Sequence, residues 1–300
     1  MFGNDIKLCE KGDFVMAFGE PARIGPNRSG PNKSQRINVK PFNMASFMIV
    51  MTLLSLTVVT VYSFITFDYK NISMTEGILL TLQNIKTMFT EPQLNHFSFW
   101  EGLHQVIITI GLAMLSTLIG AIISLFLGLL AAQNVTSPRM SNIIKVFVSF
   151  IRAIPTVLWV LIFAVAAGLG SVAAVIGMTF HSVGYLVKAY SESFEELDEG
   201  VMEALKGSGA NWWQIVFQAI LPSSITYLIS WTFLRFEMNF GVAVAMGAAA
   251  GAGGIGFDMF MASTFYLDLH EVGAITLYIL TFAILLEMIA VKIKRNLQSG

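Results

Sequence analysis

Long apolar runs separated by short polar segments dominate the pattern along this chain. A helix that crosses a bilayer needs about 20 mostly apolar residues, because each residue adds about 1.5 Å and the hydrocarbon core is roughly 30 Å thick. This pattern predicts an all-α, polytopic membrane protein with six transmembrane helices. The six runs lie at residues 44–67, 104–132, about 153–167, 172–190, 223–240 and 273–293.

Finer features of the pattern bear on packing. The second run is rich in Gly, Ala and Ser, small residues that let helix backbones approach closely in lipid, so we expect it at the centre of the bundle. Pro155 lies near the start of the third run, where a helix start or a kink would tolerate it, and this run could extend back to residue 142. We expect a short turn at residues 169–171 and an amphipathic interfacial helix at residues 78–88.

Composition supports the membrane class and excludes several others. The chain is 55% apolar and 12% charged, whereas a typical soluble domain is about 25% charged. A net charge of −1 gives no reason to expect nucleic acid as a partner. Cys9 is the only cysteine, the four histidines show no metal spacing, and no catalytic Ser/His/Asp arrangement is found. The sequence therefore predicts no enzyme activity, no metal and no cofactor in this chain.

Lys and Arg predict the orientation, because basic loops stay on the cytoplasmic side of the membrane. With the N-terminus inside, the inner segments hold fifteen of the eighteen Lys and Arg residues, and the outer loops hold only Lys70 and Lys86. Arg152 and Lys188 are expected to snorkel to the inner interface. We therefore expect a multi-pass protein of the cell inner membrane with both termini cytoplasmic. Its parts are a polar cytoplasmic tail (1–43), a first transmembrane helix (44–67), an external connection (68–103) and a transmembrane core (104–296) that includes a cytoplasmic loop (191–222).

The cytoplasmic loop has the pattern of two short helices around a turn. Asp198 can cap a helix over residues 199–206, and the glycines at 207 and 209 would end it. Asn211 with Gln214 matches the capping box of a second helix.

Pro222 disfavours a helical conformation at Leu221, so we expect a new element to begin there. The start of the loop is acidic, whereas helices that lie on membranes favour Lys and Arg on their polar face. Docking of this hairpin on a soluble partner is therefore favoured over a plain solvated loop.

The spacing within this loop resembles the Glu-Ala-Ala loop of permease subunits from ATP-binding-cassette importers. The resemblance departs at Leu205, where the family often has a small residue, and at Ala219, where it usually has isoleucine. It implies a MetI-like, type I importer core in which the loop couples the spans to an ATPase. The matching positions are Glu203, Ala204, Leu205, Gly209, Leu221 and Pro222.

The family resemblance also implies partners. A cytoplasmic ABC ATPase dimer would bind ATP and Mg, and a periplasmic or lipid-anchored substrate-binding protein would deliver the ligand. The membrane half would work as a pair, expected to be a homodimer, surrounded by membrane lipid. This chain itself would hydrolyse nothing.

A narrower resemblance points to the phosphonate-importer branch. It rests on residues 152–155, His181, the run from Arg235 to Asn239 and the glycine-rich residues 251–256. It implies translocation of phosphonate or a related phosphorus oxyanion, although Phe240 and Gly241 stand where that branch would have a basic residue. Import of another small solute, or ion-coupled secondary transport without an ATPase, are the alternatives.

Ionisable residues within spans are candidates for a translocation pathway, because a charge at mid-bilayer costs about 2.5–3.5 kcal/mol and usually faces a cavity or the bundle interior. Arg235 is the foremost, since its donor fork suits phosphorus oxyanions. Two roles remain open for Arg235, a transient contact with the ligand and a pairing with an acid that only fixes helix packing. Glu237 is an awkward partner for such a pair, because it lies two positions away and projects to another face of the helix. Glu237, Asn239 and His181 complete the candidate set for the pathway, and a packed histidine is the more common case.

The segment GAGGIG at residues 251–256 fits the pattern G-x-G-x-x-G. A dinucleotide fingerprint must follow a strand and open a helix in a βαβ unit, whereas this segment follows an alanine-rich run. We expect these glycines to form a tight or re-entrant loop on the external side instead.

Overall fold

The computed structural model describes residues 44–66 and 73–298, and the predicted cytoplasmic tail, residues 1–43, lies outside them. The chain divides into two compact units, Met1–Asp68 and Tyr69–Gly300. All regular structure in the described residues is helical, which confirms the predicted fold class. Five helices are long and apolar enough to cross a membrane, and a bent pair makes up to six.

The described part of the first unit is one helix, α1 (Met44–Thr66), which covers the first predicted span except for residue 67. It carries polar hydroxyls in an otherwise apolar sequence. Those of Thr52, Thr57 and Thr60 each donate to the carbonyl four residues earlier, at 2.8 Å. Because the hydroxyls are satisfied within the helix, they suit an apolar surrounding.

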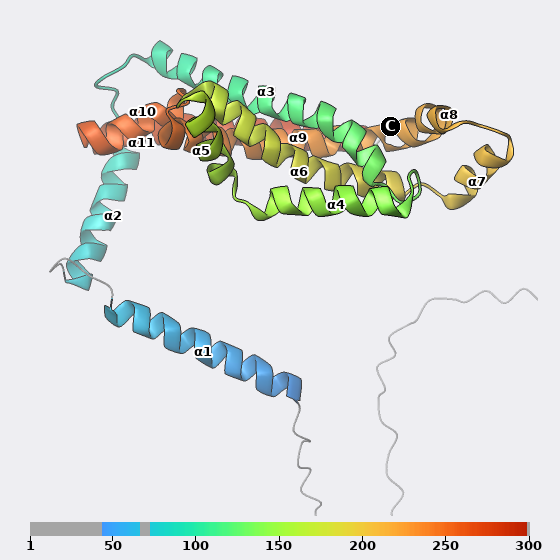
Figure 1. The fold of residues 1–300 in the computed structure, drawn as a ribbon. Helices are drawn as coiled ribbons and strands as arrows, with labels where there is room; N and C mark the ends of the chain where they lie inside the picture. Colours follow the sequence, from blue (N-terminus) through green and yellow to red (C-terminus); the bar gives the residue numbers. More distant parts are fainter. Residues whose placement is uncertain (1–43, 67–72, 299–300) are drawn as a thin grey trace, which may run out of the picture. The chain divides into compact units, whose positions relative to one another are not determined.

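Three long helices form the core of the second unit: α3 (Phe99–Ala131), α6 (Ser171–Glu195) and α9 (Leu221–Ala250), which lie side by side (Figure 1). Small residues allow their close approach, as the sequence predicted for the second run. A Cβ on Gly120 would lie 2.8 Å from the Cβ of Ser182, and one on Gly128 would lie 3.0 Å from that of Tyr190. These contacts place α3 directly against α6.

The third predicted span is broken. Helices α4 (Pro138–Ala153) and α5 (Thr156–Ala167) are bent by 87° at Ile154 and Pro155. Pro155 has no N–H to continue a helix, and it disfavours a helical conformation at Ile154, whose ψ is 123°. The twelve residues of α5 extend only about 18 Å, so this helix cannot cross a bilayer alone.

The fifth span is longer than predicted. Helix α8 (Trp212–Ile215), the π-helical turn η1 (Val216–Ile220) and α9 form one apolar stretch of 39 residues. The expectation that Leu221 leaves the helix is wrong, because its φ and ψ are −63° and −48°. Leu221 donates its N–H to the carbonyl of Val216, five residues back, and this wider turn lets the helix continue into Pro222.

The remaining helices of the second unit are α2 (Met74–Thr90), α10 (Ile255–Met261), the π-helical turn η2 (Ala262–Tyr266) and α11 (Leu269–Gln298). Helix α2 contains the predicted helix at residues 78–88 and packs against α11. The glycine-rich segment turns the chain sharply from α9 into α10, as predicted. Gly256 is required there because a side chain would overlap the carbonyl of Val244 on α9.

Candidate functional site

Helices α7 (Glu199–Gly207) and α8 form a hairpin at the end of the bundle (Figure 1). The Asp198 side chain accepts the N–H of Gly200 at 3.0 Å and caps α7, as predicted. Gly209 has a φ of 83°, which is a conformation that favours glycine, and it turns the chain after α7. Asn211 and Gln214 form the predicted capping box of α8, with bonds of 2.8 and 2.9 Å.

The inner face of this hairpin is fixed to the bundle. Met202, only 4% exposed, packs in a cluster with Leu129 of α3 and Phe194 of α6. Trp212 joins the same cluster, and its indole N–H donates to the carbonyl of Val135 at 3.1 Å. The hairpin is therefore held by both apolar burial and a hydrogen bond to the connection between α3 and α4.

The outer face of α7 is open. Glu203, Ala204 and Gly207 are exposed, whereas Leu205 is half-buried on the inner side. Glu203 has no hydrogen bond or ion pair within the part of the chain that the structure describes. An unpaired carboxylate between small residues can be approached closely by a partner.

Leu221 and Pro222 lie apart from this outer face. They begin α9, on the far side of the π-helical turn from α8, and Leu221 packs on the inner apolar cluster. The structure thus brings Glu203, Ala204 and Gly209 together on the hairpin and leaves Leu221 and Pro222 at the base of a span. These two residues therefore do not belong to the open outer face of α7.

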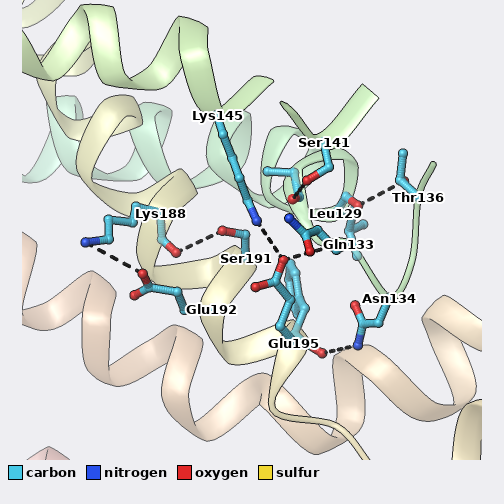
Figure 2. A network of polar contacts seen from close by, with 12 residues as sticks. Leu129, Gln133, Asn134, Thr136, Ser141, Lys145, Lys188, Ser191, Glu192 and Glu195 are labelled. Atoms are coloured by element: carbon cyan, nitrogen blue, oxygen red, sulfur yellow. Dashed lines mark hydrogen bonds and ion pairs between the residues drawn. The ribbon is translucent and has the colours of Figure 1, made fainter. Parts of the chain in front are cut away.

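Glu195, in the acidic start of the loop, is engaged within the chain. Its carboxylate accepts a hydrogen bond from the ammonium of Lys145 at 2.9 Å and another from the backbone N–H of Gln133 at 2.8 Å (Figure 2). The side chain of Asn134 donates to the carbonyl of Phe194 at 2.8 Å. These contacts join the end of α6 to the residues after α3 and to the middle of α4, so Glu195 does not belong to the open face.

A buried polar cluster lies where α3, α6 and α9 meet. Asn239, fully buried, donates its side-chain N–H groups to the hydroxyls of Thr117 at 2.7 Å and Ser182 at 2.9 Å, with Ser116 at 3.5 Å. The side-chain oxygen of Asn239 has no partner among the described residues. Since α9 ends at Ala250 and not at residue 240, this cluster lies well inside the span.

Arg235 adjoins this cluster and is 2% exposed. Its Nε donates to the hydroxyl of Ser182 at 3.1 Å, and its guanidinium lies 5.4 Å from the centre of the Tyr185 ring. Its Nη2 has no partner, and no carboxylate forms an ion pair with it among the described residues. A buried guanidinium with a free donor and no neutralising acid is arranged to receive an anion.

The other two pathway candidates differ in position. Glu237 lines a groove of about 690 Å³ between α9 and α11, together with Glu287 and Lys294, and so faces away from Arg235. His181 is half-buried next to Ser182 on α6, with no partner for its Nδ1. Bonds to Ser182 therefore group Arg235 with Asn239, whereas His181 only neighbours Ser182 along α6 and Glu237 lines another groove.

A further ionisable cluster joins residues about 170 positions apart in the sequence. His96 donates its N–H to Glu271 at 2.9 Å, and its Nδ1 lies 2.6 Å from the second oxygen of that carboxylate. Asn95 donates to Asp268 at 2.6 Å. His96, Asp268 and Glu271 offer ligand atoms within 4.8 Å of one another, a geometry that could hold a metal ion. Their oxygens already accept these hydrogen bonds, so the cluster is better suited to hold the loop after α2 against α11.

Asp268 of this cluster and Asp258, which lies near Glu271, have shifted pKa values. Burial, followed by the negative charge of Glu271, raises the pKa of Asp258 from 3.8 to about 6. The hydrogen bond from Asn95 lowers the pKa of Asp268 below its usual value. The sequence does not predict this cluster, because nothing in the local spacing indicates that residues 95–96 meet residues 268–271.

More than half of the chain matches a known family of transport proteins. Residues 124–298, which include the hairpin, Arg235 and Asn239, match the family described as binding-protein-dependent transport system inner membrane component. The phosphite transport system permease protein PtxC of Stutzerimonas stutzeri is 31% identical over 212 residues, which cover 70% of this chain and 76% of that protein. The phosphate-import permease protein PhnE of Mycolicibacterium smegmatis is 31% identical over 178 residues, which cover 59% of this chain but only 33% of that protein.

The fold also has solved counterparts. A chain of the MetNI methionine ABC transporter in an inward-facing conformation superposes with a TM-score of 0.61 at 20% identity, over 68% of this chain and 99% of that chain. A chain of a bacterial ABC transporter for the polysaccharide alginate superposes with a TM-score of 0.58 at 14% identity, over 84% and 98%. At these identities the superpositions establish the fold alone, and the substrate is not transferred by them. With the sequence match over more than half of its length, the chain belongs to the family of binding-protein-dependent transport system inner membrane components.

Proposed function

We propose that this chain is the permease subunit of an ATP-driven importer, with both termini in the cytoplasm, and that a separate ABC ATPase seats on the outer face of α7. The hairpin is the observation that carries this proposal: its inner face is locked into the bundle through Met202 and Trp212, and its outer face is open around Glu203. A surface with these two faces can receive a force and pass it to the spans.

The coupling follows from these contacts. The partner ATPase dimer supplies the nucleotide chemistry, with ATP and Mg bound on its own subunits. When that dimer closes, a hairpin seated on it must move as a rigid body, since its inner apolar face and the bond from Trp212 to Val135 resist separation from the bundle. The movement reaches α9 through the continuous helix that contains Leu221 and Pro222.

The proposed cargo is phosphonate or a related phosphorus oxyanion, delivered by a periplasmic or lipid-anchored binding protein. The names of the relatives from S. stutzeri and M. smegmatis, phosphite and phosphate import, support this substrate class. So does Arg235, whose free Nη2 could donate to such an anion. The pathway would form between two permease halves, which we take to be copies of this chain, and Asn239 and His181 would lie along it.

Gly209 provides the test of coupling. In the full transporter, Gly209→Val should abolish most ATP-driven uptake of methylphosphonate or phosphite, because a left-handed conformation costs a non-glycine residue about 1–2 kcal/mol and the turn would rearrange. Insertion into the membrane should be unchanged. Gly111→Val is the matched control, since a Cβ there meets nothing within 4 Å. Normal uptake by the Gly209 variant would refute the proposed coupling.

Two alternatives are separated by reconstitution. An ion-coupled secondary transporter would move solute in proteoliposomes with this chain alone and an ion gradient, whereas the proposed importer requires the ATPase and ATP. An importer of another small solute, such as methionine, would retain the ATP requirement but accept methionine in place of the phosphorus oxyanion. Uptake measured with methylphosphonate, phosphite and methionine in parallel distinguishes these cases.

A further inference from the structure

A second basic site lies between α4 and α6, separate from Arg235. The cavity there has a volume of about 350 Å³. Its polar lining includes three basic and two acidic side chains, and Figure 2 shows four of these five together with Ser191. The five are Lys145, Arg152, Lys188, Glu192 and Glu195.

The charges of this cavity are unequally paired. Lys145 is held by Glu195 at 2.9 Å, in a bond that also fixes the end of α6. Lys188 lies 3.6 Å from Glu192, and both side chains are more than half exposed, so this pair is loose and easily exchanged. Arg152 has no hydrogen bond or ion pair to any residue in the described part of the chain. The cavity therefore has one unneutralised guanidinium and one ammonium that can be released.

Arg152 lies where α4 and α6 approach each other closely. A Cβ on Gly184 of α6 would lie 2.9 Å from the Cγ of Arg152. The side chain of Arg152 is exposed, and its position at the inner interface of the membrane stays a prediction. A guanidinium without a protein partner in a membrane-spanning chain needs water or an anion beside it.

We infer that the cavity between α4 and α6 binds a phosphate or phosphonate group, with Arg152 as its principal donor and Lys188 as a second donor released from Glu192. The planar guanidinium can donate two parallel hydrogen bonds to such an oxyanion, and an ammonium adds a point charge. Glu192 and Glu195 at the rim would oppose a permanently bound anion. The site therefore favours exchange over tight retention.

The same group could come from the transported solute or from an anionic lipid headgroup, since basic pockets between membrane helices bind such headgroups. This inference goes beyond the proposed function, because binding at Arg152 is measured without transport. A failure of ATP-driven uptake would leave the result at Arg152 unaffected. The two sources are separated by the arms of one experiment.

The experiment measures chemical protection of Arg152 in the purified full-length chain. The chain is held in dodecyl maltoside without phospholipid or phosphate, treated with the arginine reagent phenylglyoxal, and analysed by peptide mass spectrometry. The three arms contain no addition, methylphosphonate, or the anionic lipid phosphatidylglycerol. Arg139, exposed on the same helix and outside the cavity, is the internal control.

We expect modification of Arg152 to slow about ten-fold at ten times the dissociation constant of the bound group, with Arg139 unchanged. Protection by methylphosphonate identifies the solute as the source, and protection by phosphatidylglycerol identifies the lipid. Glu192→Gln should lower the concentration needed by up to about five-fold, because Lys188 no longer has to leave its partner. Equal modification in all three arms, or equal protection of Arg139, would overturn the inference.

Discussion

At the scale of single residues, Ser182 links the two groups of the buried polar cluster. Its hydroxyl accepts from Arg235 Nε at 3.1 Å and from the amide of Asn239 at 2.9 Å, and it donates to the carbonyl of Met178 at 2.7 Å. Arg235 and Asn239 lie one turn apart on α9, and the hydroxyl of Ser182 holds both side chains on the same side of that helix. Asn239 is a positioning residue in this arrangement, whereas the Nη2 of Arg235 has no hydrogen-bond partner among the described residues.

Removal of the Asn239 amide tests this positioning role. Asn239→Ala removes the N–H groups that the Thr117 and Ser182 hydroxyls accept and opens a small cavity, so we expect a loss of about 1–3 kcal/mol in the free energy of unfolding. Thermal unfolding of the detergent-solubilised protein measures the loss. Asn142→Ala, at an exposed position of α4, should have little effect. Equal stabilities of the two variants would show that the buried bonds contribute little.

Asp258 predicts a pH dependence. Its pKa is raised from 3.8 to about 6, so the folded protein holds this proton more tightly than the unfolded chain. The resulting stabilisation is complete below pH 3.8 and is lost as the pH rises through about 6. Hydrogen exchange of α10, corrected for the intrinsic rate, should therefore show more opening at pH 8 than at pH 5. Asp258→Asn should remove this difference, and its persistence would assign it to another group.

The candidate residues were visible in the sequence, but their partners were not. Arg235 and Asn239 stood out because charged and amide side chains are costly within an apolar run. Which helix lies beside each face of α9 decides two further features. Arg235 has no acidic partner within residues 44–66 and 73–298, and Glu237 faces another groove. The pairing of His96 with Glu271 was missed for the same reason, since it joins distant loops.

At the scale of elements, local signals predicted the caps and the turn of the α7–α8 hairpin. The caps at Asp198 and Asn211 and the turn at Gly209 were predicted because each acts within a few residues. The end of the fifth span was not predicted, because residues 243–250 are small and resemble a loop. In the structure they are helical and pack closely against α10. The turn η1 was missed because Pro222 normally ends a helix, and only a wider turn allows it to continue.

The adjacent tryptophans of α8 test how the hairpin is held. Trp212 donates to the carbonyl of Val135, whereas Trp213 is 58% exposed. Trp212→Phe should cost about 1 kcal/mol and raise hydrogen exchange in α7 and α8, because the ring is kept but the bond is lost. We also expect it to lower the stimulation of the partner ATPase by substrate. Trp213→Phe is the matched control, and similar exchange in both variants would argue against this anchor.

At the scale of the whole molecule, charge and burial are distributed along the axis of the second unit. One end carries the hairpin and the ion pairs of Lys145 and Lys188, and the other carries α10 and the cluster around Glu271 (Figure 1). The buried cluster around Arg235 lies between them on α9. This order suits a permease in which an ATPase acts at one end and a solute enters at the other.

Labelling of single cysteines tests the proposed orientation of these two ends. Because Cys9 is the only cysteine, Cys9→Ser gives a background for Lys206→Cys on α7 and Gln83→Cys on α2, both at exposed positions. The excess of Lys and Arg in the segments assigned to the inside predicts α7 in the cytoplasm and α2 outside. A maleimide that reaches the periplasm but does not cross the inner membrane should then label Gln83→Cys in intact cells and Lys206→Cys only after lysis. The opposite pattern would place the hairpin out of reach of any cytoplasmic ATPase and would rule out the proposed coupling.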